Sequence, residues 1–82
     1  MFYRIHSVNP LRNKHLLVCF LDDTVKPYDM EPLIRSIPAF QILEEPVLFN
    51  QVRVDAGGYG VTWNDNLDLS CNELWEKGEI VQ

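Results

Sequence analysis

The chain has 82 residues, of which 46% are hydrophobic and 23% charged, and its formal net charge is −5 with a sequence pI near 4.7. This length fits one domain over residues 1–82, and the composition is typical of a folded chain, which excludes a disordered tail. The acidic balance repels phosphate backbones, so we expect no direct binding of nucleic acid. Arg4, Arg12 and Lys14 are the candidates for a local basic strip, against the alternative of a solvated hairpin end.

Cysteine usage and hydropathy indicate the compartment. Cys19 and Cys71 are far apart in the sequence, which is not the spacing of a zinc motif or of a disulfide scaffold. No apolar run approaches the roughly 20 residues of a membrane span, and the N-terminus lacks the pattern of a signal peptide. We therefore expect a cytoplasmic protein with reduced thiols and no membrane association.

Residues 1–28 predict three short strands. The apolar runs "MFYRIHSV" and "KHLLVCFL" flank the turn-forming stretch "NPLRN", a pattern that indicates an antiparallel hairpin. After the turn "DDT", the stretch "VKPY" predicts a third strand. Pro27 lacks the N–H group that a central strand needs, so we expect this strand to lie at a sheet edge or to end there.

Residues 30–37 predict a helix with Asp29 as its N-cap and Pro38 as its stop. Its apolar side chains fall at i, i+3, i+4 and i+7, which places them in one stripe: Met30, Leu33, Ile34 and Ile37. The following stretch "AFQILEE" lies between two prolines and predicts a short helix or a 3₁₀ turn.

The stretches "VLFNQVRVD" and "YGVTW" predict a β-hairpin around the turn "AGG". Alternation along the second strand places Tyr59, Val61 and Trp63 on one face, where core aromatics are the expected outcome and exposed stacking groups the alternative. The glycine-rich "AGGYG" lacks the Lys and the following helix of a phosphate loop, so we interpret it as a hairpin turn.

The C-terminal part predicts a turn followed by a helix at residues 71–77. Asparagine and aspartate at 64–66 favour a tight turn. Ser70 and Glu73 have the spacing of a capping box, in which the serine accepts from the Glu73 N–H and the glutamate reaches back to the Ser70 N–H. Gly78 ends the helix. The predicted fold is therefore α+β, an antiparallel sheet of about five short strands with helices near 30–37 and 71–77 on one face.

Three side chains are candidates for a small ligand- or metal-binding site, or for a minor enzymatic site: His6, His15 and Cys71. The two histidines would lie opposite each other if the first hairpin closed symmetrically about "PL", but two imidazoles do not complete a zinc site. Cys71 stands at a helix start, which favours the thiolate, but no base is near it in the sequence. The acid pairs 22–23 and 44–45 are expected to be solvated. We assign no catalytic, cofactor-binding or metal-binding residue and expect no enzyme.

Five stretches resemble the family of bacterial domains of unknown function 2442, and they span nearly the whole chain: "LLVCFLDD", "YDMEPLI", "FQIL", "FNQVRVD" and "VTWNDNLDLSCNELWE". The chain departs from the family pattern at Asp23 and Asn66, which stand where glycine is usual, and at Asn64, which replaces a proline. Asp and Asn tolerate left-handed turns best among the other residues, so the fold is expected to survive. The family's motifs are fold motifs and imply no activity.

The resemblance implies a small α+β domain that occurs alone or fused to a helix-turn-helix, encoded in many cases beside another small domain in an arrangement resembling a toxin–antitoxin pair. The leading hypothesis is accordingly a non-catalytic protein-interaction domain, an antitoxin-like partner of a small neighbouring-gene protein, or a homo-oligomer. A partner strand is expected to pair with the edge near Pro27 or with the N-terminal strand. The alternative is the small ligand- or metal-binding domain or minor enzyme described above.

Overall fold

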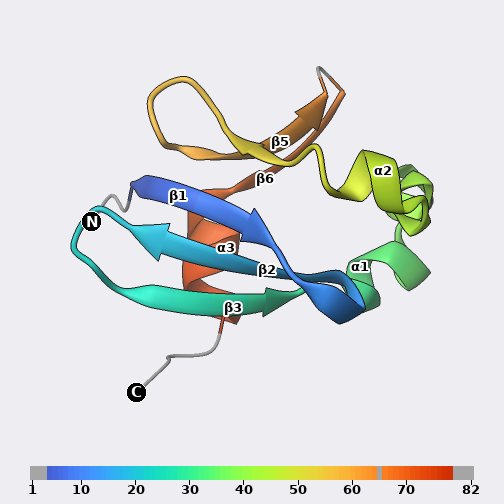
Figure 1. Ribbon diagram of the computed structural model, residues 1–82, viewed down its shortest axis with the longest axis horizontal. Coiled ribbons are helices and arrows are strands. Elements are labelled where there is room, and N and C mark those ends of the chain that lie inside the picture. Colours follow the sequence, from blue (N-terminus) through green and yellow to red (C-terminus); the bar gives the residue numbers. More distant parts are fainter. Residues whose placement is uncertain (1–3, 65, 79–82) are drawn as a thin grey trace.

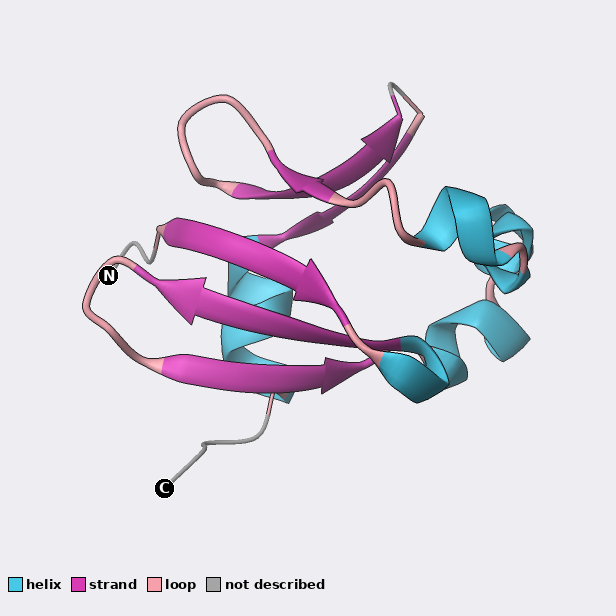
Figure 2. Ribbon diagram, in the orientation of Figure 1, coloured by secondary structure: helices cyan, strands magenta, loops and turns pink. Residues whose placement is uncertain are grey.

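The computed structural model describes residues 4–64 and 66–78. It is an α+β domain, as predicted, but its strands form two three-stranded antiparallel sheets and not one sheet of five (Figure 1, Figure 2). We call β1–β3 the N-terminal sheet and β4–β6 the C-terminal sheet. The two sheets are joined by a helical segment at one end of the molecule (Figure 2).

The N-terminal sheet consists of β1 (Ile5–Pro10), β2 (His15–Phe20) and β3 (Val25–Asp29), in that order. The 3₁₀ turn η1 (Arg12–Lys14) connects β1 to β2. The prediction that Pro27 lies on an edge strand is confirmed, because β3 is the outer strand of the order.

The turn between β2 and β3 contains Asp23 in the left-handed conformation, with φ of 71°. Its N–H donates to the Phe20 carbonyl, and Asp22 Oδ1 accepts from the Thr24 N–H at 3.0 Å. The aspartate at position 23 therefore fills the conformation for which glycine is the usual residue.

The helical segment comprises α1 (Glu31–Ser36), η2 (Pro38–Glu44) and α2 (Pro46–Phe49). The 3₁₀ prediction is confirmed by η2. The strand predicted from "VLFNQVRVD" is wrong over its first half, because Glu45 caps α2 by accepting from the Leu48 N–H at 3.0 Å. Met30, not Asp29, is the N-cap of α1, although the Asp29 carboxylate accepts from the Glu31 N–H just inside it.

The C-terminal sheet consists of β4 (Arg53–Val54), β5 (Gly60–Asn64) and β6 (Leu67–Ser70). Strand β6 was not predicted from the sequence, and its four residues pair antiparallel with β5. The sheet stays short because β4 has two residues, and the loop 55–59 returns the chain to β5.

Helix α3 (Cys71–Lys77) follows β6 directly and packs on the N-terminal sheet. Ser70 caps it by accepting from the Glu73 N–H at 3.2 Å, so this half of the capping box is confirmed. The other half is wrong, because the Glu73 carboxylate accepts a hydrogen bond at 2.8 Å from the Tyr28 hydroxyl of β3. Gly78 ends the helix in an extended conformation, and any side chain there would clash with the Leu74 carbonyl and with Lys26.

One hydrophobic core lies between the two sheets, the helical segment and α3. Trp63 is almost fully buried and donates its indole N–H to the Phe49 carbonyl at 3.1 Å, which ties β5 to α2. On the other side, the rings of Phe20 and Trp75 meet edge to face at 4.8 Å and fix α3 against β2. The core thus holds one face of each sheet and leaves the opposite faces outside.

Candidate functional site

The two histidines lie at opposite ends of the N-terminal sheet. In the observed register Pro10 pairs with Leu16, and the Leu11 N–H donates to the His15 carbonyl, so His15 stands opposite Leu11. His6 lies in the bulge at the far end, next to the Ile5–Phe20 pair. The symmetric closure about "PL" is therefore wrong, because the turn at η1 shifts the register and separates the imidazoles by most of the length of a strand.

Cys71 is 7% exposed and belongs to the hydrophobic core cluster. Its backbone N–H donates to the Tyr59 carbonyl at 2.8 Å, so the residue joins β6 and α3 to the loop before β5. Within 4–64 and 66–78, no group of three or more His, Cys, Asp and Glu side chains is placed to hold a metal ion.

The basic residues of the N-terminal part do not form one strip. Arg4 lies before β1, where its guanidinium stacks on the ring of Tyr59 at 4.8 Å. Arg12 and Lys14 lie beyond the other end of β1, roughly 20 Å away for a strand of six residues. Tyr59 itself is 48% exposed, so the prediction of a core aromatic is wrong at this position and right at Trp63.

The outer face of the N-terminal sheet is the candidate site. Side chains alternate along β2, so those that face α3 are buried while their neighbours are half-buried on the opposite side. Four of these outward side chains form two directly paired rows, and we call them the outer strip: Leu17 opposite Pro27, and Cys19 opposite Val25. In Figure 1, α3 lies behind the sheet, and no described helix or strand lies over its front.

Polar and charged groups surround the outer strip. Ser7 and Asn9 of β1 pair with Cys19 and Leu17 and form one side. The turn at one end carries the exposed Asp22 and Asp23, and hydrogen bonds from Thr24 hold the pKa of the Asp22 carboxyl below its ordinary value.

The other end of the strip combines charges of both signs. Asp29 Oδ1 lies 3.9 Å from His15 Nε2, and Lys77 of α3 lines a small cavity with these two residues. The face as a whole is therefore an apolar centre with one acidic end and one mixed end.

The sequence contained a pattern typical of this face. The run "LLVCFL" is apolar at every position, which is typical of a strand covered on both sides, whereas a strand with one solvated face alternates apolar and polar residues. The run was predicted only as one strand of the first hairpin, with no assignment of its two faces. The register, which could not be read from the sequence, shows that half of its side chains point away from the core.

The geometry defines a class of protein: a small α+β domain with two antiparallel sheets, one core and an apolar sheet face that no helix or strand within 4–64 and 66–78 covers. The chain belongs to the family described as "Protein of unknown function (DUF2442)", whose model matches residues 5–79. The family resemblance found in the sequence is thereby confirmed. No curated protein matches the chain.

The fold is similar to that of a crystal structure from Nitrosomonas europaea ATCC 19718, of the protein named "Putative DNA Binding Protein NE0471". The TM-score is 0.82 at 19% sequence identity, so the likeness concerns the fold alone. It covers 94% of this chain and 49% of that chain, and this chain therefore spans about half the length of that protein. Among the described residues, no helix has the length and apolar character needed to cross a membrane.

Proposed function

We propose that this domain is a non-catalytic protein-interaction module, and that a partner protein covers the outer strip. The observation that carries the proposal is the apolar pairing of Leu17 with Pro27 and of Cys19 with Val25 on a face that no described element covers. Contact with water is unfavourable for apolar side chains at the outward positions of two neighbouring strands. Burial of these side chains against another surface would be favourable.

The charges around the outer strip favour a partner with a complementary basic rim. Asp22 and Asp23 stand at one end, and no lysine or arginine lies among the outward residues of β2 and β3. A second copy of this chain, with a net charge of −5, would bring acids against acids. The occupant we propose is therefore a different protein, with an apolar centre and Lys or Arg side chains that meet the Asp22–Asp23 end.

The sheet face is a better docking surface than the free edge of β3. The Phe20 N–H donates to the Thr24 carbonyl, so the backbone groups of Thr24 and of every second residue after it point toward β2. Pro27 falls between these positions, and its backbone nitrogen therefore points to the free edge. Because proline has no N–H, an added partner strand would miss its central donor. Pairing through this edge, one of the two alternatives that the sequence suggested, is thus not part of the proposal.

Two observations support a role without catalysis. His6 and His15 are at opposite ends of the sheet, and Cys71 lies in the core. A nucleophile and its base must come within hydrogen-bond distance, and these candidate groups do not converge.

We further propose that this domain does not itself bind nucleic acid. The name of the Nitrosomonas europaea protein concerns a chain about twice the aligned length. Here the acidic balance and the separation of Arg4 from Arg12 and Lys14 support the absence of a phosphate-binding track. Fluorescence anisotropy with labelled duplex and single-stranded DNA near physiological salt should show no saturable binding, and saturable binding would refute this part.

The finer form of the proposal is an antitoxin-like role toward a small protein encoded by a neighbouring gene. It rests on the family resemblance together with the acidic end of the outer strip, which suits a basic partner. Co-expression of the neighbouring small protein with this chain should relieve any growth arrest that the neighbour causes alone. Growth arrest that persists with a bound partner would refute the antitoxin role and leave the interaction itself intact.

The experiment uses the full chain, purified with its partner from the native host, after which the partner is identified and produced separately. Binding is measured by calorimetry for the wild type, for a Leu17→Thr/Val25→Thr double variant and for Asp23→Asn. Asparagine keeps the left-handed turn while removing the charge. We expect the double variant to bind at least about tenfold more weakly, and Asp23→Asn to reduce the salt dependence.

Val47→Thr is the matched control, because Val47 is an exposed β-branched residue of α2, outside the outer strip. It should bind as the wild type does. The proposal is refuted if the double variant keeps full affinity, if the control loses as much as the double variant, or if the wild type purifies as a stable homodimer with no other protein.

A further inference from the structure

Strand β2 is apolar on both faces, and its inner face already packs against a helix. On that side the Phe20 ring meets the Trp75 ring of α3 edge to face, and Lys26 of the neighbouring β3 donates to the Trp75 carbonyl. On the other side the outer strip occupies the same two strands. A strand with one solvated face alternates apolar and polar residues, whereas residues 16–20 are all apolar. Strand β2 therefore has the pattern of a strand between two packed layers.

The width of the outer strip fits one helix. Its two apolar rows lie on neighbouring strands, which are about 4.8 Å apart. The next row of the same face, on β1, is polar and consists of Ser7 and Asn9. A helix is about 10 Å in diameter and covers two strands, whereas a second sheet would also cover β1 and remove these two polar side chains from water. The strip thus favours a helix over a sheet.

The length of the strip fits about three helical turns. Strand β2 has six residues and spans about 20 Å, a distance that a helix of about 13 residues covers at about 1.5 Å per residue. Charged groups stand at both ends of this length. Asp22 and Asp23 are exposed at one end, and Asp29 lies 3.9 Å from His15 at the other. A helix on the strip is therefore apolar in its middle and charged at its ends.

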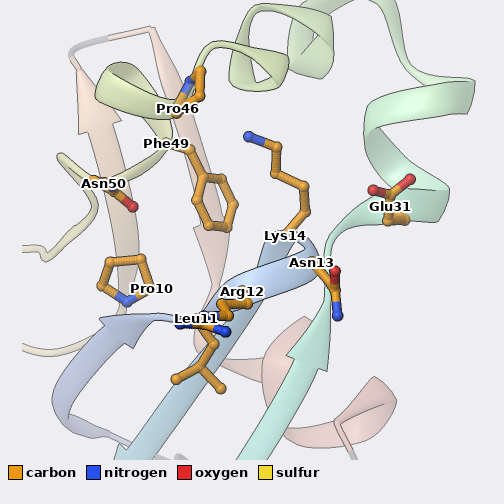
Figure 3. Close-up of a pocket in the computed structure, with 9 residues that line it drawn as sticks. All are labelled: Pro10, Leu11, Arg12, Asn13, Lys14, Glu31, Pro46, Phe49 and Asn50. Carbon is orange, nitrogen blue, oxygen red and sulfur yellow. The ribbon is translucent and has the colours of Figure 1, made fainter.

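The lysine that precedes β2 is engaged within the domain. Figure 3 shows the side chain of Lys14 extending from the β1–β2 turn toward the helical segment. Its ammonium donates to the Glu44 carbonyl at 3.1 Å and stands 4.9 Å from the centre of the Phe49 ring. The carboxylates of Asp22 and Asp23 therefore determine which charge a partner needs at their end of the strip.

We infer that the element covering the outer strip is an amphipathic helix of the partner protein. This inference rests on the proposed function and specifies the part of the partner that binds. The apolar stripe of the helix lies on the four side chains of the outer strip, and its Lys or Arg side chains stand at the end next to Asp22 and Asp23. In the bound form, β2 and β3 lie between α3 and the partner helix, an arrangement of three layers.

The test uses the full ¹⁵N-labelled chain and two synthetic peptides of about 14 residues with identical composition. In one peptide the leucines recur at i, i+3, i+4 and i+7, and in the other they alternate with polar residues. Both peptides carry lysines at the C-terminal end, where cations suit a helix. We expect the helix-patterned peptide to cause saturable amide shifts centred on residues 17–19 and 25–26. It should bind at least about tenfold more tightly than the strand-patterned peptide, and its ¹³C shifts should report helix in the bound state.

Two variants and one altered peptide serve as controls. The Leu17→Thr/Val25→Thr double variant should bind the helix-patterned peptide at least about tenfold more weakly. Val47→Thr, at an exposed position of α2, should change the dissociation constant less than about twofold. Replacing the lysines of the peptide by glutamates should weaken binding, because they would meet the exposed acids at 22–23.

The helix inference is refuted if the strand-patterned peptide binds the strip as tightly as the helix-patterned one, or if the helix-patterned peptide causes no saturable shift there. It is also refuted if Val47→Thr weakens binding as much as the double variant does. These results leave the proposed function intact, because that proposal depends on the binding of the native partner to the variants of the strip. A native partner that binds the double variant with full affinity refutes the proposed function, and with it the helix inference.

Discussion

On the C-terminal sheet the outward row of side chains is Arg53, Thr62 and Asp68, whereas on the N-terminal sheet the corresponding rows are Leu17 with Pro27 and Cys19 with Val25. Two of the three side chains in this polar row make hydrogen bonds within the domain. Arg53 donates to the Trp63 carbonyl at 3.3 Å, and the Thr62 hydroxyl lies 2.7 Å from the Asn64 carbonyl.

The two sheets share one core, so burial on the inner side cannot account for the difference between their outer faces. Alternation of apolar and polar residues is the expected pattern for an antiparallel sheet with one solvated face, and the C-terminal sheet follows it. The N-terminal sheet departs from it at four adjacent positions. If these four positions do not stabilise the domain itself, the departure marks the face on which function is to be sought.

The largest expected effect tests whether the two faces of β2 differ as described. Leu16 is fully buried on the inner face, so Leu16→Ala removes packed methyl groups and leaves a cavity. We expect a loss of about 2–5 kcal/mol in the free energy of unfolding, measured by urea denaturation. A loss below about 1 kcal/mol would mean that the inner face of β2 is not the packed one, and the comparison of the faces would fail.

A second prediction concerns the contact that joins the N-terminal sheet to α3. Tyr28→Phe removes the hydrogen bond from the tyrosine hydroxyl to the Glu73 carboxylate. We expect a loss of about 1.5 kcal/mol at neutral pH, because hydrogen bonds to charged groups are at the upper end of the usual range. Glu73→Gln should lose less, because the amide oxygen still accepts, and an equal loss would show that the charge, not the hydrogen bond, carries the effect.

The same contact predicts a pH dependence. Burial, followed by the hydrogen bond to Glu73, raises the pKa of Tyr28 above its ordinary value of 10.0. Above that pH the unfolded chain releases the tyrosine proton while the folded chain keeps it, so the folded state binds more protons and stability falls as the pH rises. Urea denaturation from neutral pH to above pH 10.0 should show a steeper alkaline loss for the wild type than for Tyr28→Phe. Parallel curves would contradict the raised pKa.

Local rules account for the parts of the fold that the sequence predicted. The Ser70 cap, the 3₁₀ segment and the turn at Asp23 depend on residues within a few positions of each other. The partner of Glu73 lies 45 residues away on β3, and no local pattern distinguishes a carboxylate that caps a helix from one that accepts from a distant tyrosine. The capping box was therefore half right.

Register explains most of what the sequence could not provide. The 3₁₀ turn with Asn13 and Lys14 at positive φ contains no glycine, so the point where the first hairpin closes had no sequence marker. That point decides both the separation of the histidines and the side to which Leu17 points. In contrast, α2 had a local pattern that was missed, since Glu45 followed by Pro46 is a typical helix start.

A fourth prediction concerns the polar face of the C-terminal sheet. Thr62→Val keeps the β-branched shape but removes the hydroxyl that contacts the Asn64 and Leu67 carbonyls across the turn between β5 and β6. We expect a loss of about 1 kcal/mol in the free energy of unfolding, the usual net value of a hydrogen bond. Thermal unfolding by circular dichroism is sufficient to measure it. A neutral effect would mean that the Thr62 hydroxyl has no stabilising role in the isolated domain.

The smallest expected effect decides the comparison. Leu17→Thr places a polar strand-forming residue at the centre of the outer strip, where the native leucine is half-buried and pairs with Pro27. If the strip serves a partner, the change should cost less than about 1 kcal/mol in the isolated domain, the range of surface substitutions. If the strip instead stabilises the domain, the loss should approach that of Leu16→Ala in the same urea experiment. The ratio of the loss for Leu16→Ala to the loss for Leu17→Thr therefore measures how far the outer face of β2 contributes to stability. A large ratio would leave binding of a partner protein as the reason why Leu17 is apolar.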